Sequence, residues 1–213
     1  MRKRAVWAML VAAVVAGPAL IYPYLTLDAA DSRLEVSAGV HYAVLVAHIF
    51  TAAVALVLGP LQFVPRVRAR RRLHRLLGRT YLLAGVVPAA VTAIPVAVWS
   101  GRALTRVSLT VAAMLWLVTA GMAYRAARRG RFTEHRDWMT RNYALTFLAV
   151  TSRMVVPLMM VATGSTRENV AQMIPIGQTL GWIINLAVAE VIIRRRRSDL
   201  TAAGRTPARS FRP

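Results

Sequence analysis

Residues 62–81 read QFVPRVRARRRLHRLLGRTY, a stretch crowded with arginine around His74 and flanked on both sides by long apolar runs. A weaker copy, RAARRGRFTEHRDWMTRNY at residues 125–143, is centred on His135, 61 residues after His74. Each copy contains His-Arg, then another arginine, then a tyrosine, and leads into a further apolar run. Charge is thus confined to short segments between apolar ones, which is typical of a membrane protein.

The composition supports the same class. Hydrophobic residues make up 57% of the chain, and the mean hydropathy is +0.48. Apolar stretches of about 20 residues cross a hydrocarbon core of roughly 30 Å as helices. The connections are short and include no soluble domain, so the sequence predicts an all-α polytopic membrane protein with six transmembrane helices. The predicted spans are Ala5–Leu27, Val40–Val64, Thr80–Trp99, Val107–Tyr124, Asn142–Thr163 and Gln172–Ile193.

The net charge of +20 would ordinarily raise nucleic acid as a partner. If the N-terminus lies in the cytoplasm, however, 23 of the 28 Lys and Arg residues fall on that side, as the positive-inside rule requires. We therefore expect a multi-pass protein of the cell membrane, with both termini cytoplasmic and no nucleic-acid partner. Arginines beside the bilayer are expected to hold anionic phospholipids, at about 1 kcal/mol each.

Three regions are predicted along the chain. Residues 1–39 hold the first transmembrane helix and an outer loop, and that apolar run is too long for a signal peptide, so we expect an uncleaved span. Residues 40–193 form a five-helix membrane domain. Residues 194–213 form a basic cytoplasmic tail that we expect to be disordered. The absence of cysteine excludes disulfides, zinc-thiolate sites and iron–sulfur clusters.

The second to fifth spans form two hairpins that point in the same direction, and we expect them to make a four-helix core. His74, Gly78 and Tyr81 share one helical face, and His135 and Tyr143 likewise project to one side of their helix. If the hairpins are related by an axis along the membrane normal, the two histidines would face one another at the cytoplasmic end.

Facing imidazoles on different helices are the ligands that a six-coordinate b-type haem requires, and helix bundles often hold such sites. In this hypothesis His74 and His135 are the metal ligands, and nearby arginines bind the propionates. The other predicted cofactor-binding residues are Arg75, Arg79, Tyr81, Arg136, Arg141 and Tyr143. The alternative is that these residues bind lipid phosphate or cap helices.

Ionisable side chains within the spans are a second candidate site, because polar groups at that depth are costly and often functional. From their depths we expect an intramembrane polar cluster that includes Arg153, with Glu190 as a weaker guess for its ionic partner. The expected members are His48, Thr51, Arg153, Asn185 and Glu190. The alternatives are a histidine that is simply packed against a neighbour, and an arginine that extends to the membrane surface.

A longer pattern connects these residues. It runs His48, Gly59-Pro60, Gln62-Phe63, His74-Arg75-x-x-Gly78-Arg79-x-Tyr81, Trp116, His135-Arg136-x-Trp138-Met139-x-Arg141-x-Tyr143, Arg153, Trp182, Asn185 and Glu190. The pattern resembles the bacterial membrane proteins grouped as domain of unknown function family 2306 (DUF2306). The resemblance covers about residues 40–193 and rests chiefly on the two histidine motifs. It implies a polytopic membrane protein and no particular activity.

Three hypotheses about function follow. The first is a haem-binding or electron-transfer protein that uses His74 and His135. The second is a proton- or solute-coupled carrier that uses the intramembrane cluster. The third is a structural or lipid-binding partner with a basic inner face. Hydrolytic catalysis is not expected, since neither a Ser-His-Asp arrangement nor paired carboxylates can be found in the sequence.

Overall fold

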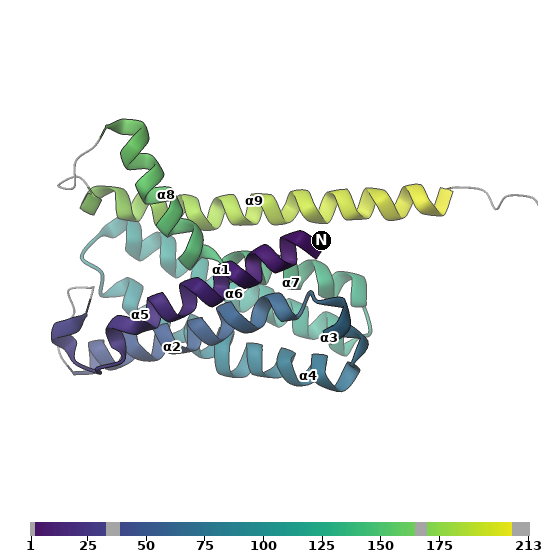
Figure 1. Ribbon diagram of the computed structural model, residues 1–213, viewed down its shortest axis with the longest axis horizontal. Helices are drawn as coiled ribbons and strands as arrows, with labels where there is room; N and C mark the ends of the chain where they lie inside the picture. The colour runs from purple at the N-terminus through teal and green to yellow at the C-terminus, as the bar shows by residue number, and fades with distance from the viewer. Residues whose placement is uncertain (1–2, 33–38, 165–169, 206–213) are drawn as a thin grey trace, which may run out of the picture.

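A computed structural model describes residues 3–32, 39–164 and 170–205 of the chain, and all regular secondary structure in these residues is helical (Figure 1). A lipid environment favours this outcome, because a helix satisfies its backbone hydrogen bonds internally. The helices are α1 (Lys3–Ile21), α2 (Val40–Leu61), α3 (Pro65–Ala69), α4 (Arg71–Thr80), α5 (Val87–Val98), α6 (Ala103–Arg128), α7 (Phe132–Thr146), α8 (Leu148–Thr163) and α9 (Val170–Arg205). Shorter segments are η1 (Tyr22–Tyr24), η2 (Ala29–Asp31) and the π-helical η3 (Tyr81–Val86).

The helices confirm an all-α polytopic membrane protein. Five are long and apolar enough to cross a membrane, and the third of these runs without a break through α4, η3 and α5, over Arg71–Val98. A sixth span forms if α7 and α8 are taken together, although they meet at an angle of 48°. The described residues therefore contain five spans, or six when the bent pair counts as one.

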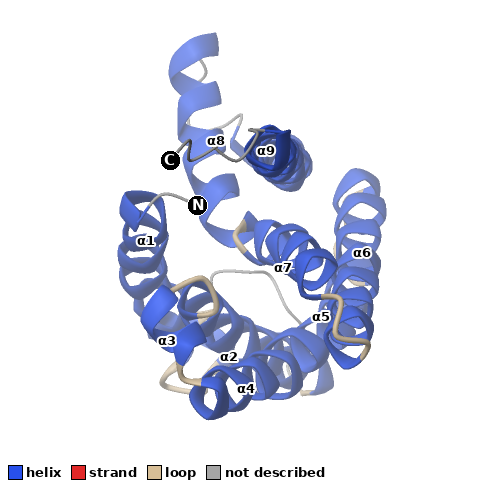
Figure 2. Cartoon of the chain, turned by 90° about the vertical axis from the view of Figure 1, so that its right-hand side faces the viewer, coloured by secondary structure: helices blue, strands red, loops and turns tan. Residues whose placement is uncertain are grey.

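The bend in the fifth span was not predicted from the sequence. It lies at Phe147, between α7 and α8. Here the Val150 N–H donates a hydrogen bond to the carbonyl of Phe147, three residues earlier instead of the four of a regular α-helix. The Thr151 hydroxyl donates to the same carbonyl at 3.3 Å. A tightened turn and a hydroxyl bonded back to the backbone both bend helices. As a result α8 leaves the bundle and lies at its periphery beside α9 (Figure 2).

Several helices extend beyond the predicted spans, because hydropathy ends a span at its first charges whereas a helix can continue into water. The fourth span extends at both ends to Ala103–Arg128. Similarly, α9 continues to Arg205 and extends beyond the other helices (Figure 1), so residues 194–205 of the predicted disordered tail are helical. Residues 206–213 lie outside the described residues.

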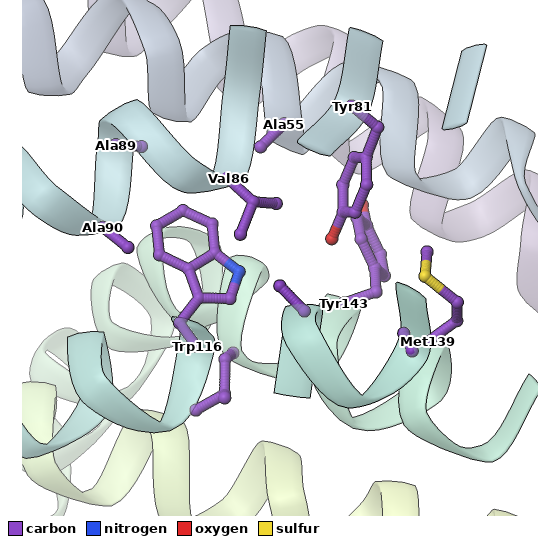
Figure 3. Packing of buried hydrophobic residues seen from close by; sticks show 11 residues of the cluster. Ala55, Tyr81, Val86, Ala89, Ala90, Trp116, Met139 and Tyr143 are labelled. Carbon is purple, nitrogen blue, oxygen red and sulfur yellow. The ribbon is translucent and has the colours of Figure 1, made fainter. Parts of the chain in front are cut away.

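The four-helix core predicted for the second to fifth spans is present. Its buried residues come from α2, η3, α5, α6 and α7, with Trp116 and Tyr143 among the large ones (Figure 3). Small residues bring the helices close together. At Gly85 a Cβ would lie 3.0 Å from the backbone of Ala55, so α2 and η3 are in direct backbone contact. At Gly59 a Cβ would overlap the ring of Tyr143.

A buried polar network crosses this core. The Tyr81 hydroxyl donates to Asn142 Oδ1 at 2.6 Å and lies 3.0 Å from Thr146 Oγ1. Trp116 Nε1 donates to the same threonine oxygen at 3.0 Å, and Asn142 Nδ2 donates to the Thr119 hydroxyl and the Trp116 carbonyl, both at 2.9 Å. Because these groups satisfy one another, the network joins the third span to α6 and α7 at little desolvation cost.

Candidate functional site

The two histidine motifs lie at one end of the bundle. We call this the basic end and define it as α3, α4, the connection between α6 and α7, and the part of α9 after Glu190 (Figure 1). Both motif histidines lie at this end, and the electrostatic field of His135 reaches His74. That the two imidazoles face one another stays a prediction.

The two rings differ in their hydrogen bonding. His135 Nδ1 lies 2.8 Å from the Ala123 carbonyl. A carbonyl only accepts, so Nδ1 carries the proton and Nε2 of the neutral ring is left as an acceptor. By contrast, His74 Nδ1 is buried with no hydrogen-bond partner among the described residues. The site therefore contains one oriented imidazole and one whose ring nitrogen lacks a partner.

The two tyrosines of the motifs belong to the core. Tyr81 is 0% and Tyr143 is 3% exposed. The Tyr81 hydroxyl is held in the polar network, and the Tyr143 hydroxyl donates to the Leu56 carbonyl at 3.1 Å. Both hydroxyls are satisfied within the protein, so their role is to fix the helices that carry the histidines.

The motif arginines have separate environments. Arg75 and Arg79 are exposed, and the Arg75 Nε–H donates to the carbonyl of Arg71 in its own helix. Arg136 is half-buried. Arg141 forms a bidentate ion pair with Glu190, at 2.5 and 3.0 Å, and its guanidinium lies 4.7 Å from the Trp138 ring centroid. Glu190 therefore pairs with Arg141. The weaker expectation, an ion pair between Glu190 and Arg153, was wrong.

The sequence reasoning missed Asp137, which is 1% exposed and lies between the helices. Its two carboxylate oxygens accept from Arg196 and from both Nε and Nη2 of Arg197. These bonds fasten α7 to α9. The signal in the sequence was an acidic residue within a mainly basic motif, where Glu134 is the other acidic residue. A buried carboxylate requires cationic partners, and arginines are close in the sequence.

The predicted intramembrane cluster is not present as a single group. His48 and Arg153 line one cavity of about 300 Å³. Asn185 lines another, of about 250 Å³, and bonds to the Ala144 carbonyl and the Thr151 hydroxyl. The Thr51 hydroxyl bonds back to the carbonyls of Ala47 and His48 in its own helix. The residues predicted to form one cluster therefore face different neighbours.

The cavity beside His48 lies among several helices. Residues of α1, η1, α2, α5, α6, α7, α8 and α9 contribute to its wall, most of them alanine or leucine. His48 Nδ1 lies 2.9 Å from the Ala89 carbonyl, and the Arg153 guanidinium donates to the Ala149 carbonyl at 2.7 Å. The other residues with polar side-chain atoms that line it are Tyr24, Trp116, Thr146, Ser152 and Gln178.

Comparison with known proteins identifies a family. No curated protein and no solved structure matches the chain. A family model described as "Predicted membrane protein (DUF2306)" matches residues 45–193, which include α4, both histidine motifs and most of the residues that line the two cavities. The family expected from the histidine motifs is confirmed: the chain belongs to the DUF2306 family of predicted membrane proteins.

Proposed function

We propose that this protein binds a small, mainly apolar molecule with a hydroxyl group inside the membrane, and that His48 accepts the hydrogen bond of that hydroxyl. The cavity of about 300 Å³ carries the proposal. Its volume is at the lower end of the range for ligand pockets, and a wall of apolar side chains with few polar groups is typical of such pockets.

The orientation of His48 supports a ligand that donates a hydrogen bond. The Ala89 carbonyl can only accept, so the Nδ1 atom of a neutral His48 carries the proton. Nε2 then has a free lone pair, and the ring borders the cavity. Backbone anchoring of Nδ1 is also the usual way in which a protein orients a functional imidazole.

Arg153 contributes to the chemistry of the same cavity. Its guanidinium bonds to a carbonyl of α8, and its side chain lines the wall formed by that helix. A cation near a hydroxyl favours the partial negative charge that develops on the oxygen as the hydroxyl donates to His48. A phenolic hydroxyl is a stronger donor than an aliphatic one, so a quinol is the class of ligand that fits best.

Quinol binding to His48 can be measured directly. A short-chain alkyl quinol, added under reducing conditions to detergent-purified protein, should quench tryptophan fluorescence, because Trp116 lines the cavity. His48→Ala is expected to weaken binding about tenfold, the equivalent of one hydrogen bond of about 1–1.5 kcal/mol. Ala112→Leu, which adds volume to the cavity wall, should abolish binding and leave the helix content unchanged.

Two controls separate this site from general partitioning into detergent. His41→Ala removes the other histidine of α2, whose ring packs on Trp99 at 4.8 Å and does not line the cavity, and should bind the quinol as the wild type does. The second control is the dimethyl ether of the quinol. It keeps the ring and its alkyl substituent, but a methyl group replaces each hydroxyl hydrogen, so it cannot donate a hydrogen bond. Equal affinity for quinol and ether, or an unchanged Kd in His48→Ala, would contradict the proposal.

Haem binding by His74 and His135 stays a prediction. Neither of the two cavities described above is lined by either histidine. On the same face of α4 as His74, a Cβ at Gly78 would lie 3.3 Å from Gln62 Oε1. If haem is bound, the purified protein supplemented with haem should show a Soret band that disappears in the double variant His74→Ala, His135→Ala. A folded but colourless protein would exclude the haem hypothesis.

We further propose that the basic end faces the cytoplasm, as the positive-inside rule favours. A reporter fused after Pro213 would then lie in the cytoplasm, and a reporter that needs another compartment would be inactive there. Alkaline phosphatase, which needs an oxidising compartment, is expected to be inactive at that position.

A further inference from the structure

Three buried side-chain nitrogen atoms have no hydrogen-bond partner within the part of the chain that the structure describes, and they lie at the basic end or in the short connection between α2 and α3 beside it. They are Gln62 Nε2, His74 Nδ1 and Arg196 Nε. Native proteins rarely leave such donors unpaired, and a bound group that supplies acceptors is one reason for an exception. This set of atoms is distinct from the cavity beside His48 and points to a second ligand.

The first two of these atoms come from adjacent elements. Gln62 follows the last residue of α2, is 5% exposed, and faces α4, where a Cβ at Gly78 would lie 3.3 Å from its Oε1 atom. His74 precedes Gly78 by four residues, so it lies one turn away on the same face of α4. A single ligand between α2 and α4 can therefore meet both the amide and the imidazole.

The charge around these donors is positive. Arg68 lies in the electrostatic field of both His74 and Arg136, and Arg196 also acts on Arg136. Among the described residues neither Arg68 nor Arg136 has a salt bridge, because the buried carboxylate nearby, Asp137, pairs with Arg196 and Arg197. Several cations thus surround the unpaired donors without a matching number of anions.

We infer that Gln62, His74, Arg68 and Arg136 bind a phosphate group. Phosphate offers acceptor oxygens in a tetrahedral arrangement, which suits donors that arrive from α3, α4, α7 and the end of α2, and guanidinium groups bind it with strong charge-assisted hydrogen bonds. The phosphate comes either from a lipid headgroup at the membrane boundary or from a soluble phosphate compound. The binding chemistry is the same in both cases.

Gln62→Met is the most informative variant, because it removes the unpaired amide without changing the net charge or much of the volume. The full chain in a zwitterionic detergent is titrated with inorganic phosphate in one experiment and with micelles containing phosphatidic acid in another, while its melting temperature is followed. Wild-type protein is expected to gain thermal stability with the anion, and Gln62→Met to need about tenfold more of it. Without the anion, Gln62→Met should be at least as stable as the wild type.

His74→Phe provides a second test, and Arg79→Gln is the control for general electrostatics, since Arg79 is an exposed arginine of the same helix. His74→Phe should also require about tenfold more anion, whereas Arg79→Gln should stay within about twofold of the wild type. Stabilisation by phosphatidic acid alone assigns the phosphate to a lipid, stabilisation by inorganic phosphate alone assigns it to a soluble compound, and stabilisation by both assigns the site to phosphate in general.

Three results would overturn the inference. The first is an absence of stabilisation by either anion. The second is an equal loss of anion response in Arg79→Gln and in the two site variants, which would show that only overall charge matters. The third is a lower melting temperature of Gln62→Met without anion, because the amide would then be satisfied by the protein itself.

Discussion

Asp137→Ala is expected to lower the free energy of unfolding by about 3–5 kcal/mol, the range measured when one partner of a buried ion pair is removed. The carboxylate is 1% exposed and accepts from two arginines of α9. Without it, Arg196 and Arg136 would lie close together with no anion between them. The helix pair α7 and α9 would then keep its apolar contacts, the Arg141–Glu190 ion pair and the hydrogen bond from Asn185 to the Ala144 carbonyl. Unfolding of the detergent-solubilised protein by sodium dodecyl sulfate, followed by circular dichroism, measures this change.

The matched control is Glu134→Ala, which removes the same charge three residues away. Glu134 pairs with Arg131 at 3.0 Å, but both side chains are partly exposed, at 35% and 52%. Such pairs contribute about 0–1 kcal/mol. If Asp137→Ala and Glu134→Ala have the same effect on unfolding, burial of the ion pair does not matter and our account of the α7–α9 contact is wrong.

Gly59→Ala should destabilise the protein by about 3 kcal/mol, because one methyl group at this position has no space. A Cβ would overlap the ring of Tyr143, and that ring is 3% exposed and enclosed by the core. Overpacking of this kind typically costs about 1–3 kcal/mol. Displacement of the ring also breaks the hydrogen bond from its hydroxyl to the Leu56 carbonyl, at a cost of about 1 kcal/mol.

Gly121→Ala in α6 is the comparison for this prediction. A Cβ at Gly121 meets nothing within 4 Å. Alanine is the better helix former by about 0.8–1 kcal/mol in exposed helix interiors, so the variant is expected to be as stable as the wild type or slightly more stable. An equal loss of stability in both variants, in the same unfolding assay, would mean that backbone flexibility and not the Tyr143 contact explains the glycine at position 59.

The sequence predicted the features that depend on position along the membrane normal. Hydropathy located the spans, and helical rise placed His48 and Arg153 deep within them. Both residues do line one cavity. The two basic segments also lie at one end of the bundle (Figure 1), the arrangement expected for segments that are separated by two spans.

The sequence did not predict which side of each helix a residue faces, because that depends on the packing of neighbouring helices. Thr51 and Asn185 were placed in the cluster by depth, yet their hydroxyl and amide bond elsewhere. Asp137 was overlooked for the same reason, since only the position of α9 reveals its two arginines. The bend at Phe147 depends on local backbone hydrogen bonds that hydropathy does not detect.

The π-helical segment η3 explains why a regular helical wheel misplaces residues in the third span. A wide turn accommodates one additional residue, and each residue of an α-helix corresponds to a rotation of about 100°. The residues before Tyr81 are therefore rotated relative to those after Val86, compared with an unbroken helix. This irregular turn sets the rotation of α4 about the helix axis relative to α5. The direction in which His74 points therefore depends on the π-helical turn as well as on the packing of α5 against α2.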